Sequence, residues 1–392
     1  MSTSPAKPPI LFLGTQMARA GAQEVLLTQA RWFFGRGYPV QVAFFYDKEG
    51  LHAEWQAAHP FPIHNLHAWE PEAGALANGP RLVLGLLPLW SLLRREGIQV
   101  MEAFTPHSNM LGIPVAWLSR VPRRIATHHG YIEGSSKRLS RAHSWLVNSG
   151  LATHMVAVSE RVRRMAVEVE GVRVERTSVI LNGIELAARA PLAADKVTQL
   201  RQSLDVPETA QLVLAVGRLM EQKGHMYLLD AIPGILDHHP DAVFAIAGEG
   251  PLRSALERKA QDLGISKVMR FLGLRPDIPD LLQAADLFVM PSLWEGLPIA
   301  LLEAMGASLP VVVSEVEGVD EVIDHERNGL LVAPKDVAGL TAAVESLLND
   351  PQLRRRLGTA ARETLAVEYT VERMCKQYEA LFLDAYAGDS HA

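Results

Sequence analysis

Two carboxylates stand in an otherwise apolar stretch, WEGLPIALLEAM, at residues 294–305. Pro298 suits the first turn of a helix, because its missing N–H would be unsatisfied there anyway. Glu295 then precedes the helix and Glu303 lies inside it. At roughly 1.5 Å per residue, the helix between them covers about 12 Å, too far for two carboxyl groups that share a proton. We therefore expect two separate contacts to one extended ligand, unless both groups are ordinary surface charges.

Cationic residues follow another apolar run at a short interval. The run QLVLAV ends at Val216 and leads into Gly217 and Arg218, and Lys223 follows a few positions later. A guanidinium and an ammonium beside a glycine-bearing strand end suit a diphosphate, although two surface cations would also explain the spacing. Glu295 follows a third run, LFVMPS, and the N-terminus of the helix behind it attracts phosphate. Since ligands of parallel sheets bind at the carboxyl ends of strands, these residues together predict a phosphate-bearing ligand.

The apolar runs that position these residues alternate with helical patterns along the whole chain. They are continuous in Val, Leu, Ile and Phe, as in parallel strands that are covered on both faces. Two successive doubly wound α/β domains are therefore predicted, at residues 1–190 and 191–369, with the join near 182–195. A last helical pattern occupies residues 370–388.

Length and composition restrict the class of protein. The chain has 392 residues, too many for one compact core, and its 48% hydrophobic content is that of a globular protein. A single cysteine, Cys375, excludes a disulfide framework, a cysteine zinc cluster and a Cys-x-x-Cys redox pair. The start, MSTSPAKPPILFLG, predicts a strand and not a signal peptide. The longest apolar region, residues 81–95, is shorter than the ~20 residues of a membrane span, so a cytoplasmic protein is expected.

The charge is divided unevenly between the two halves. Residues 1–190 hold 20 Lys and Arg against 14 Asp and Glu, whereas residues 191–392 hold 18 against 30. The basic half is clustered, at Arg120, Arg123 and Arg124, at Lys137, Arg138 and Arg141, and at Arg161, Arg163 and Arg164. The clusters indicate a surface for an anionic membrane or an anionic acceptor, unless they are solvated helix faces. Residues 81–95 could insert shallowly beside them or face the core. No nucleic-acid partner is expected, because no reading motif accompanies the charges.

Taken in order, the segments GRLMEQKG, AGEGP, PSLWEGLPIALLEAM and RNGLLVAP resemble the retaining, nucleotide-sugar-dependent glycosyltransferases of family four, which are glycogen-synthase-like and have the GT-B fold. The resemblance covers nearly the whole chain and is strongest from Val216 to Pro334. It implies two Rossmann-like domains that face a cleft, with the helix at 370–388 packed back on the first domain. It also implies transfer of a sugar, from a UDP-sugar first and a GDP-sugar second, to a glycan or lipid-linked acceptor in polysaccharide or glycolipid assembly.

The resemblance assigns roles to the residues singled out above. Arg218 and Lys223, beside Gly217, would bind the donor diphosphate, and alanine at either position should weaken donor binding with the fold intact. Glu303 would hold the ribose, and Glu295 would contact the transferred sugar. The remaining donor contacts would come from the backbone of Gly296, Leu297 and Pro298.

The first half matches the family less completely. The segment MARAGAQEVLL supplies Gly21 and Ala22 where the family has a pair of glycines that approach the diphosphate. The segment THHG resembles the family's histidine at a strand end, and His129 would contact the transferred sugar near the reacting carbon. Because neighbouring strand residues point to opposite faces, only one of His128 and His129 should line the site. The alternative for each is a buried, hydrogen-bonded histidine.

No Asp-x-Asp element occurs in the sequence, so a transferase that neutralises the leaving diphosphate with a metal lacks its usual ligands. We expect no metal and no other cofactor, because cationic side chains and helix termini can provide the positive charge. A retaining reaction without an evident nucleophile points to a front-face mechanism. In it the leaving phosphate oxygen accepts the proton of the incoming hydroxyl on the same side of the sugar. A sugar-nucleotide 2-epimerase on the same fold and a non-catalytic nucleotide-sugar-binding protein remain as alternatives. A dehydrogenase would need Gly-x-Gly-x-x-Gly after the first strand, where LFLGTQMARAGA does not provide it.

Overall fold

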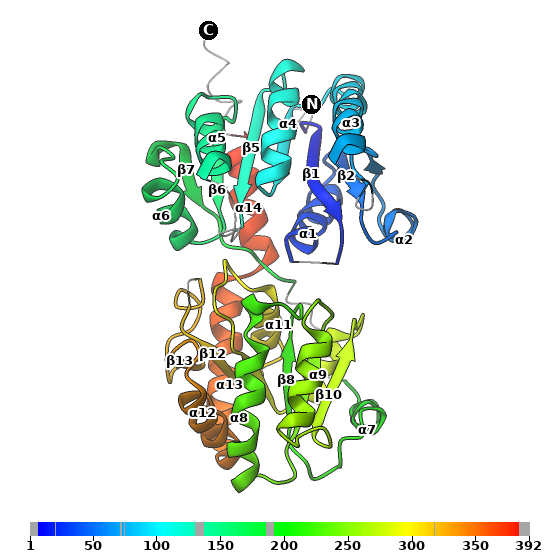
Figure 1. The fold of residues 1–392 in the computed structure, drawn as a ribbon. Helices are drawn as coiled ribbons and strands as arrows, with labels where there is room; N and C mark the ends of the chain where they lie inside the picture. The colour runs from blue at the N-terminus through cyan, green and yellow to red at the C-terminus, as the bar shows by residue number, and fades with distance from the viewer. Residues whose placement is uncertain are drawn as a thin grey trace. The chain divides into compact units, whose positions relative to one another are not determined.

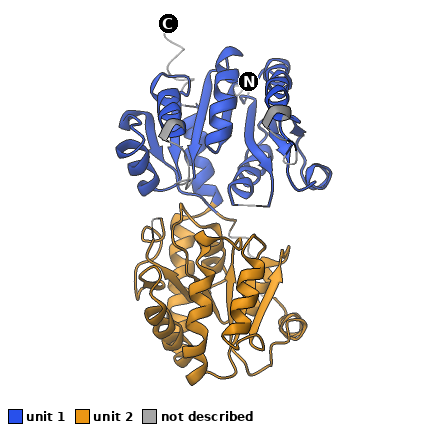
Figure 2. Cartoon of the chain, in the orientation of Figure 1, with its two compact units in different colours: residues 1–183, 371–392 blue, residues 184–370 orange. Residues whose placement is uncertain are grey.

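The computed structural model describes residues 7–19, 21–70, 73, 75–129, 137–185, 192–316 and 318–383; of residues 75–77, 137 and 138 it describes the backbone only. The chain divides into two compact units (Figure 2). Unit 1 comprises residues 1–183 and 371–392, and unit 2 comprises residues 184–370. The predicted join at 182–195 contains this boundary, although residues 186–191 lie outside the described part of the chain.

Unit 1 is built on a seven-stranded sheet in which every pair of neighbouring strands is parallel (Figure 1). Its strands are β1 (Ile10–Met17), β2 (Val40–Asp47), β3 (Ile63–Asn65), β4 (Val100–Phe104), β5 (Arg123–His128), β6 (His154–Ala157) and β7 (Thr177–Val179). They lie in the order β3-β2-β1-β4-β5-β6-β7. The order reverses between β1 and β4, which is the switch point at which doubly wound sheets bind ligands.

Helices cover both faces of this sheet. They are α1 (Gly21–Gly35), α2 (His52–Ala58), α3 (Ala75–Arg95), α4 (Pro106–Leu118), α5 (Lys137–Asn148), α6 (Glu160–Glu168) and α14 (Val371–Leu383), with a short turn η1 (Val174–Arg176). Right-handed crossovers place α1 on one face and α3, α4 and α5 on the other, because the direction of winding changes after β3. Contacts of α4 with both α3 and α5 agree with this layer.

Unit 2 repeats the same winding with six parallel strands (Figure 1). They are β8 (Leu212–Val216), β9 (Val243–Ala247), β10 (Met269–Gly273), β11 (Leu287–Met290), β12 (Val311–Ser314) and β13 (Leu330–Val332). The order β10-β9-β8-β11-β12-β13 puts the switch point between β8 and β11. The helices are α7 (Ala194–Ser203), α8 (His225–His238), α9 (Arg253–Asp262), α10 (Ile278–Ala284), α11 (Ile299–Gly306), α12 (Val337–Asn349) and α13 (Pro351–Glu368), with the turn η2 (Glu221–Lys223).

The continuous apolar runs form the buried layers of both units. In unit 2 every residue of β9 and β11 is buried, and the same holds for β4 in unit 1. Burial on both sides removes any need for alternating polar residues, as the sequence pattern predicted. None of the described helices combines the length and hydrophobicity needed to cross a bilayer.

The last described helix, α14, packs in unit 1 against α1. The Phe382 and Phe33 rings lie 5.2 Å apart, and Glu372 accepts hydrogen bonds from Trp32 and Arg36, both at 2.7 Å. Apolar and ionic contacts thus fix the end of the chain to the sheet formed by its beginning. The predicted helix at 370–388 is observed as Val371–Leu383, and residues 384–388 lie outside the described part of the chain.

Candidate functional site

Two loops meet at the switch point of unit 2. Gly217 and Arg218 follow β8, and Lys223 ends the turn η2 in the same loop. The backbone N–H of Leu293, just after β11, donates to the carbonyl of Gln222 at 2.7 Å. The side-chain amide of Gln222 donates in return to the carbonyl of Trp294 at 3.0 Å. The two loops are therefore held together by reciprocal hydrogen bonds between uncharged groups.

An ion pair joins the same two loops. The ammonium of Lys223 lies 2.5 Å from Oε1 of Glu295, which also accepts a hydrogen bond from the hydroxyl of Ser292 at 2.7 Å. The side chain of Glu295 is only 6% exposed and that of Lys223 is 18% exposed. The structure thus brings together two residues that the sequence analysis treated separately, and it adds Ser292, which was not predicted.

Close backbone approach holds this arrangement in place. Gly224 has a φ of 62°, and a Cβ at this position would overlap the carbonyl group of Pro291 at the end of β11. Gly318 has a φ of 78°, and a Cβ there would overlap the carbonyl of Gly296. Only glycine satisfies both the backbone conformation and the space at these two points.

The helix α11 begins one residue later than predicted. Pro298 has extended backbone angles and precedes the first helical residue, Ile299, so the expectation that it occupies the first turn is wrong by one position. Leu297 and Pro298 are buried, and Gly296 is half-buried. Glu303 lies in the second turn of α11 and is half-buried. The helix N-terminus therefore follows directly on the loop that carries Glu295.

The two predicted cations differ in their surroundings. Arg218 is exposed, whereas Lys223 packs its methylene groups beside the backbone of Gly217 and pairs with Glu295. An exposed guanidinium is free to turn toward a ligand. A paired ammonium still has two further hydrogens to donate, because an ammonium donates three. Both can therefore bind phosphate, but only Lys223 also supports the fold.

In unit 1 the predicted residues lie after β1 and β5. Gly21 and Ala22 form the first turn of α1. His129 follows β5 directly, and its ring stacks on that of Phe104 at 5.6 Å between centroids. His128, the last residue of β5, is buried, while His129 is partly exposed. The two neighbouring rings thus occupy different environments, as alternation along a strand predicts.

The hydrogen bonds around Thr127 determine the tautomer of His129. The hydroxyl of Thr127 donates to the carbonyl of Ala103 at 2.9 Å, so its single hydrogen is used. It must then accept from Nε2 of His129, 3.3 Å away. Although His129 is partly exposed, the protein around its ring removes most of its water, and this desolvation, followed by the neighbouring His128, lowers the pKa of His129 to about 4. Near neutral pH His129 is therefore uncharged, with its proton on Nε2 and its Nδ1 lone pair available to accept a hydrogen bond.

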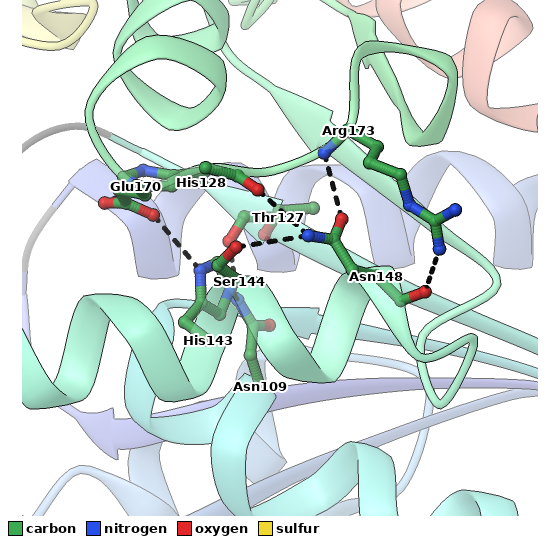
Figure 3. A network of polar contacts seen from close by, with 9 residues as sticks. Asn109, Thr127, His128, His143, Ser144, Asn148, Glu170 and Arg173 are labelled. Carbon is green, nitrogen blue, oxygen red and sulfur yellow. Dashed lines mark hydrogen bonds and ion pairs between the residues drawn. The ribbon is translucent and has the colours of Figure 1, made fainter.

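Behind this strand end lies a buried polar network that the sequence analysis missed (Figure 3). Glu170 lies 3.1 Å from Nε2 of His128 and 3.4 Å from Nδ1 of His143. Although burial opposes it, the hydrogen bonds from both histidines lower the pKa of Glu170 to about 2. Asn109 links the network to the backbone, since its amide nitrogen lies 3.0 Å from the carbonyl of Thr127 and 3.1 Å from Nε2 of His143.

His128, His143 and Glu170 are close enough together to be considered as metal ligands. The hydrogen-bond directions argue against this use. The carbonyl of Thr127 can only accept, so it fixes the amide of Asn109 as a donor, and Nε2 of His143 must accept from it. The proton of His143 then sits on Nδ1, which donates to Glu170 and has no lone pair for a metal. The cluster is therefore a hydrogen-bonded support for the end of β5.

The ion pair of Lys223 changes what its removal should do. We predict that Lys223→Ala lowers the stability of unit 2 by about 3 kcal/mol, because it leaves the buried carboxylate of Glu295 without its counter-ion. Arg218→Ala, at an exposed position, should leave stability unchanged. The measurement is urea unfolding of both variants and of Lys223→Ala/Glu295→Gln, in which the unpaired charge is gone. Equal stability of the Lys223 and Arg218 variants would contradict the structural role of the pair.

The tautomer of His129 is directly measurable. We predict that two-bond ¹H–¹⁵N correlations show the His129 ring protonated on Nε2 and neutral down to about pH 4. Thr127→Val should allow the Nδ1–H tautomer as well, because the accepting hydroxyl is lost, and Thr127→Ser should restore the original state. His129→Asn identifies the signal by its loss. An Nδ1–H tautomer in the unmodified protein would refute the assignment.

Comparisons with known proteins identify the family of the chain. The family model described as glycosyl transferases group 1 matches residues 196–364, and the model for glycosyltransferase family 4 matches residues 19–188. The chain is 30% identical over 306 residues to the UDP-Gal:alpha-D-GlcNAc-diphosphoundecaprenol alpha-1,3-galactosyltransferase of Escherichia coli, covering 76% of this chain and 79% of that protein. It is 32% identical over 266 residues to a glycogen synthase of Mycobacterium tuberculosis, covering 67% and 61%.

Solved structures show the same fold. The crystal structure of Anabaena HepE in complex with UDP-glucose superposes with a TM-score of 0.84 at 24% identity, covering 95% of this chain and 99% of that one. Sucrose-phosphate synthase of Thermosynechococcus elongatus gives a TM-score of 0.81 at 19% identity, covering 98% and 100%. The predicted family and fold are confirmed: the chain belongs to glycosyltransferase family 4 and is a glycosyltransferase with the GT-B fold.

Proposed function

We propose that this glycosyltransferase moves a sugar from a UDP-sugar to a hydroxyl group of a glycan or lipid-linked acceptor, with retention at the anomeric carbon and without a metal. The observation that carries the proposal is the contact between Lys223 and Glu295 at the switch point of unit 2. It sets a phosphate-binding cation and a hydroxyl-binding carboxylate side by side, as the junction of sugar and diphosphate in a donor requires. Of the similar proteins, one is named as using UDP-Gal and another was crystallised with UDP-glucose.

The donor would be held by charges that the protein itself provides. Lys223 can donate to Glu295 and to a diphosphate oxygen at once, and exposed Arg218 can approach the same group from solvent. The N-terminus of α11 adds N–H groups and a partial positive charge. Glu303 would accept hydrogen bonds from the ribose hydroxyls. A UDP-sugar is the first choice of donor and a GDP-sugar is the second.

In the proposed front-face reaction the acceptor hydroxyl approaches the anomeric carbon on the side of the leaving group. The bond from the anomeric carbon to the phosphate oxygen breaks, and the bond to the acceptor oxygen forms on the same face. The acceptor's proton passes to the leaving phosphate oxygen, so the products are the glycosylated acceptor and the nucleoside diphosphate. Lys223 and Arg218 would stabilise the charge that develops on the diphosphate. Glu295 would orient the sugar, and Nδ1 of His129 would accept a hydrogen bond from one of its hydroxyls.

The acceptor is proposed from the similar proteins and from the charge of unit 1. The Escherichia coli protein is named for an acceptor carried on diphosphoundecaprenol, and a Rhizobium meliloti protein, 28% identical over 311 residues, is named for lipopolysaccharide core biosynthesis. A lipid-linked acceptor would bring this chain to the inner face of a membrane as a peripheral protein. A 2-epimerase on the same fold would instead convert a donor with no acceptor present.

A panel of nucleotides tests the donor class. We predict that UDP and a UDP-sugar raise the thermal unfolding midpoint, because a ligand of the native state stabilises it by mass action, and that GDP raises it less. The shift should be the same with and without EDTA if no metal takes part. Conversion of the UDP-sugar in the absence of an acceptor would favour the epimerase. A lack of response to every nucleotide would remove the proposed function.

Substitutions of Glu303 and Glu295 should affect different steps of the reaction. Glu303→Ala should weaken UDP binding about ten- to a hundredfold, since hydrogen bonds to a charged group contribute about 1.5–3 kcal/mol. Glu295→Gln keeps the shape beside Lys223 but loses the charge, so turnover should fall while UDP binding is retained. The measurements are calorimetric titration with UDP and the initial rate of transfer, with exposed Glu208→Ala as the matched control. Equal loss of UDP affinity in both variants would rule out this division of roles.

A further inference from the structure

Three neighbouring helices on one face of unit 1 contain no acidic residue. The helices α3, α4 and α5 contain no Asp or Glu in their sequences. The helix α4 contacts both of the others, so the three form one continuous layer. Glu70 and Glu96, which flank α3 in the sequence, lie outside the helix and pair with Arg81 and Arg95; Glu72, which is nearer to the start of α3, lies outside the described part of the chain. An acid-free helical layer on a chain of net negative charge is unusual for a merely solvated face.

The same layer exposes large apolar side chains. Seven of them are between 47% and 65% exposed to solvent: Val83, Leu84, Leu87, Trp90, Trp117, Leu118 and Trp145. The opposite stripe of α3 is buried, with Leu89 fully covered and Leu92 and Leu93 nearly so. Of the predicted alternatives for residues 81–95, the core-facing one holds for one side of α3. The other side presents apolar side chains to solvent, and shallow insertion there stays a prediction.

The three exposed tryptophans of this layer lie toward the carboxyl ends of their helices. Trp90 lies in the last turns of α3, Trp117 in the last turn of α4 and Trp145 in the last turn of α5. Trp117 and Trp145 line one shallow groove together with Pro114 and Leu151. Crossover helices run opposite to the strands, so all three ends lie toward the amino-end edge of the sheet. His129, by contrast, lies at the carboxyl ends of the strands.

Arginines surround the apolar side chains. Arg94 at the end of α3, Arg120 just after α4 and Arg141 in α5 are all exposed. Tryptophan is favoured at the boundary between water and hydrocarbon, where its ring is half in each, and arginine is attracted to the anionic headgroups there. Aliphatic side chains beside them would enter the upper acyl region.

We propose that the outer surface of α3, α4 and α5 docks unit 1 on an anionic lipid bilayer. A second copy of the chain fits this surface less well, because a symmetric dimer would oppose arginines to arginines with no acid to pair them. A nucleic acid would match the arginines and tryptophans, but Val83, Leu84, Leu87 and Leu118 cannot stack on bases. The proposal rests on the proposed function and deepens it, since it names the surface by which the chain would dock on the membrane that carries a lipid-linked acceptor.

The assignment also refines the basic clusters predicted from sequence. Arg124 donates hydrogen bonds to the carbonyls of Gly150 and Leu151, and Arg163 is paired with Glu160. These two side chains are therefore engaged within the protein and are poor candidates for headgroup contacts. The side chains of Lys137 and Arg138 lie outside the described part of the chain.

The test is sedimentation of the full-length protein with vesicles of phosphatidylcholine alone or enriched in phosphatidylglycerol. We expect binding to the anionic vesicles and weaker binding at high salt, because screening reduces the contribution of the arginines. Trp117→Ser/Trp145→Ser should lower the partition coefficient at least about tenfold. Arg94→Gln/Arg141→Gln should lower it about 30-fold at low salt.

Matched controls come from unit 2. Leu274→Ser/Val367→Ser replaces two equally exposed apolar side chains, and Arg258→Gln/Arg355→Gln replaces two exposed arginines. Neither should change the binding. The proposal is overturned if the unmodified protein does not bind anionic vesicles, or if the control variants lose as much vesicle binding as the test variants. It is also overturned if Trp117→Ser/Trp145→Ser leaves vesicle binding unchanged and instead abolishes a dimer or RNA binding. The vesicles carry no acceptor and no donor is added, so this test is independent of the proposed function. A protein that binds the vesicles but does not bind UDP would support the docking surface and contradict the proposed function.

Discussion

The contact on which the site depends is the ion pair between Lys223 and Glu295. It joins loops that are 72 positions apart in the sequence and become neighbours only because β8 and β11 are adjacent in the sheet. A pair so little exposed adds little net stability, because removing two charges from water offsets most of their attraction. Its consequence is positional. It holds the carboxylate in one place, and it holds the ammonium in the loop that follows β8.

The backbone around the pair leaves little freedom for either loop. Gly224 lies against Pro291, and Gly318 lies against Gly296, with no room for a side chain at either glycine. These contacts come from segments after β8, β11 and β12, so the loops that follow three neighbouring strands of the sheet converge on one point. A charged pair alone would tolerate many loop positions. Together with these steric limits it specifies one, which is the preorganisation that a transferase acting on a charged leaving group requires.

Much of the fold could be predicted from sequence, because burial on both faces leaves a clear mark in continuous apolar runs such as those of β9 and β11. The three-residue strands β3, β7 and β13 leave no such mark and were missed. The site was predicted as a set of residue types, but its pairing was not. Nothing local in the sequence shows that Glu295 meets Lys223, or that Glu170 reaches His128 from 42 positions away. Such contacts arise from the order of the strands in the sheet, which the pattern of apolar residues along the sequence does not reveal.

The polarity of a parallel sheet explains how unit 1 could serve chemistry and docking at once. All strands end at one edge, where Gly21 and His129 lie, and all crossover helices end toward the other, where Trp117 and Trp145 are exposed. A bilayer that contacted the helix ends would leave the carboxyl edge open to water, from which the proposed nucleotide-sugar donor would diffuse. If the apolar side chains had gathered at the carboxyl edge instead, docking would have covered the residues that follow β1 and β5. The opposite directions of strands and crossover helices are thus what keeps the two surfaces apart.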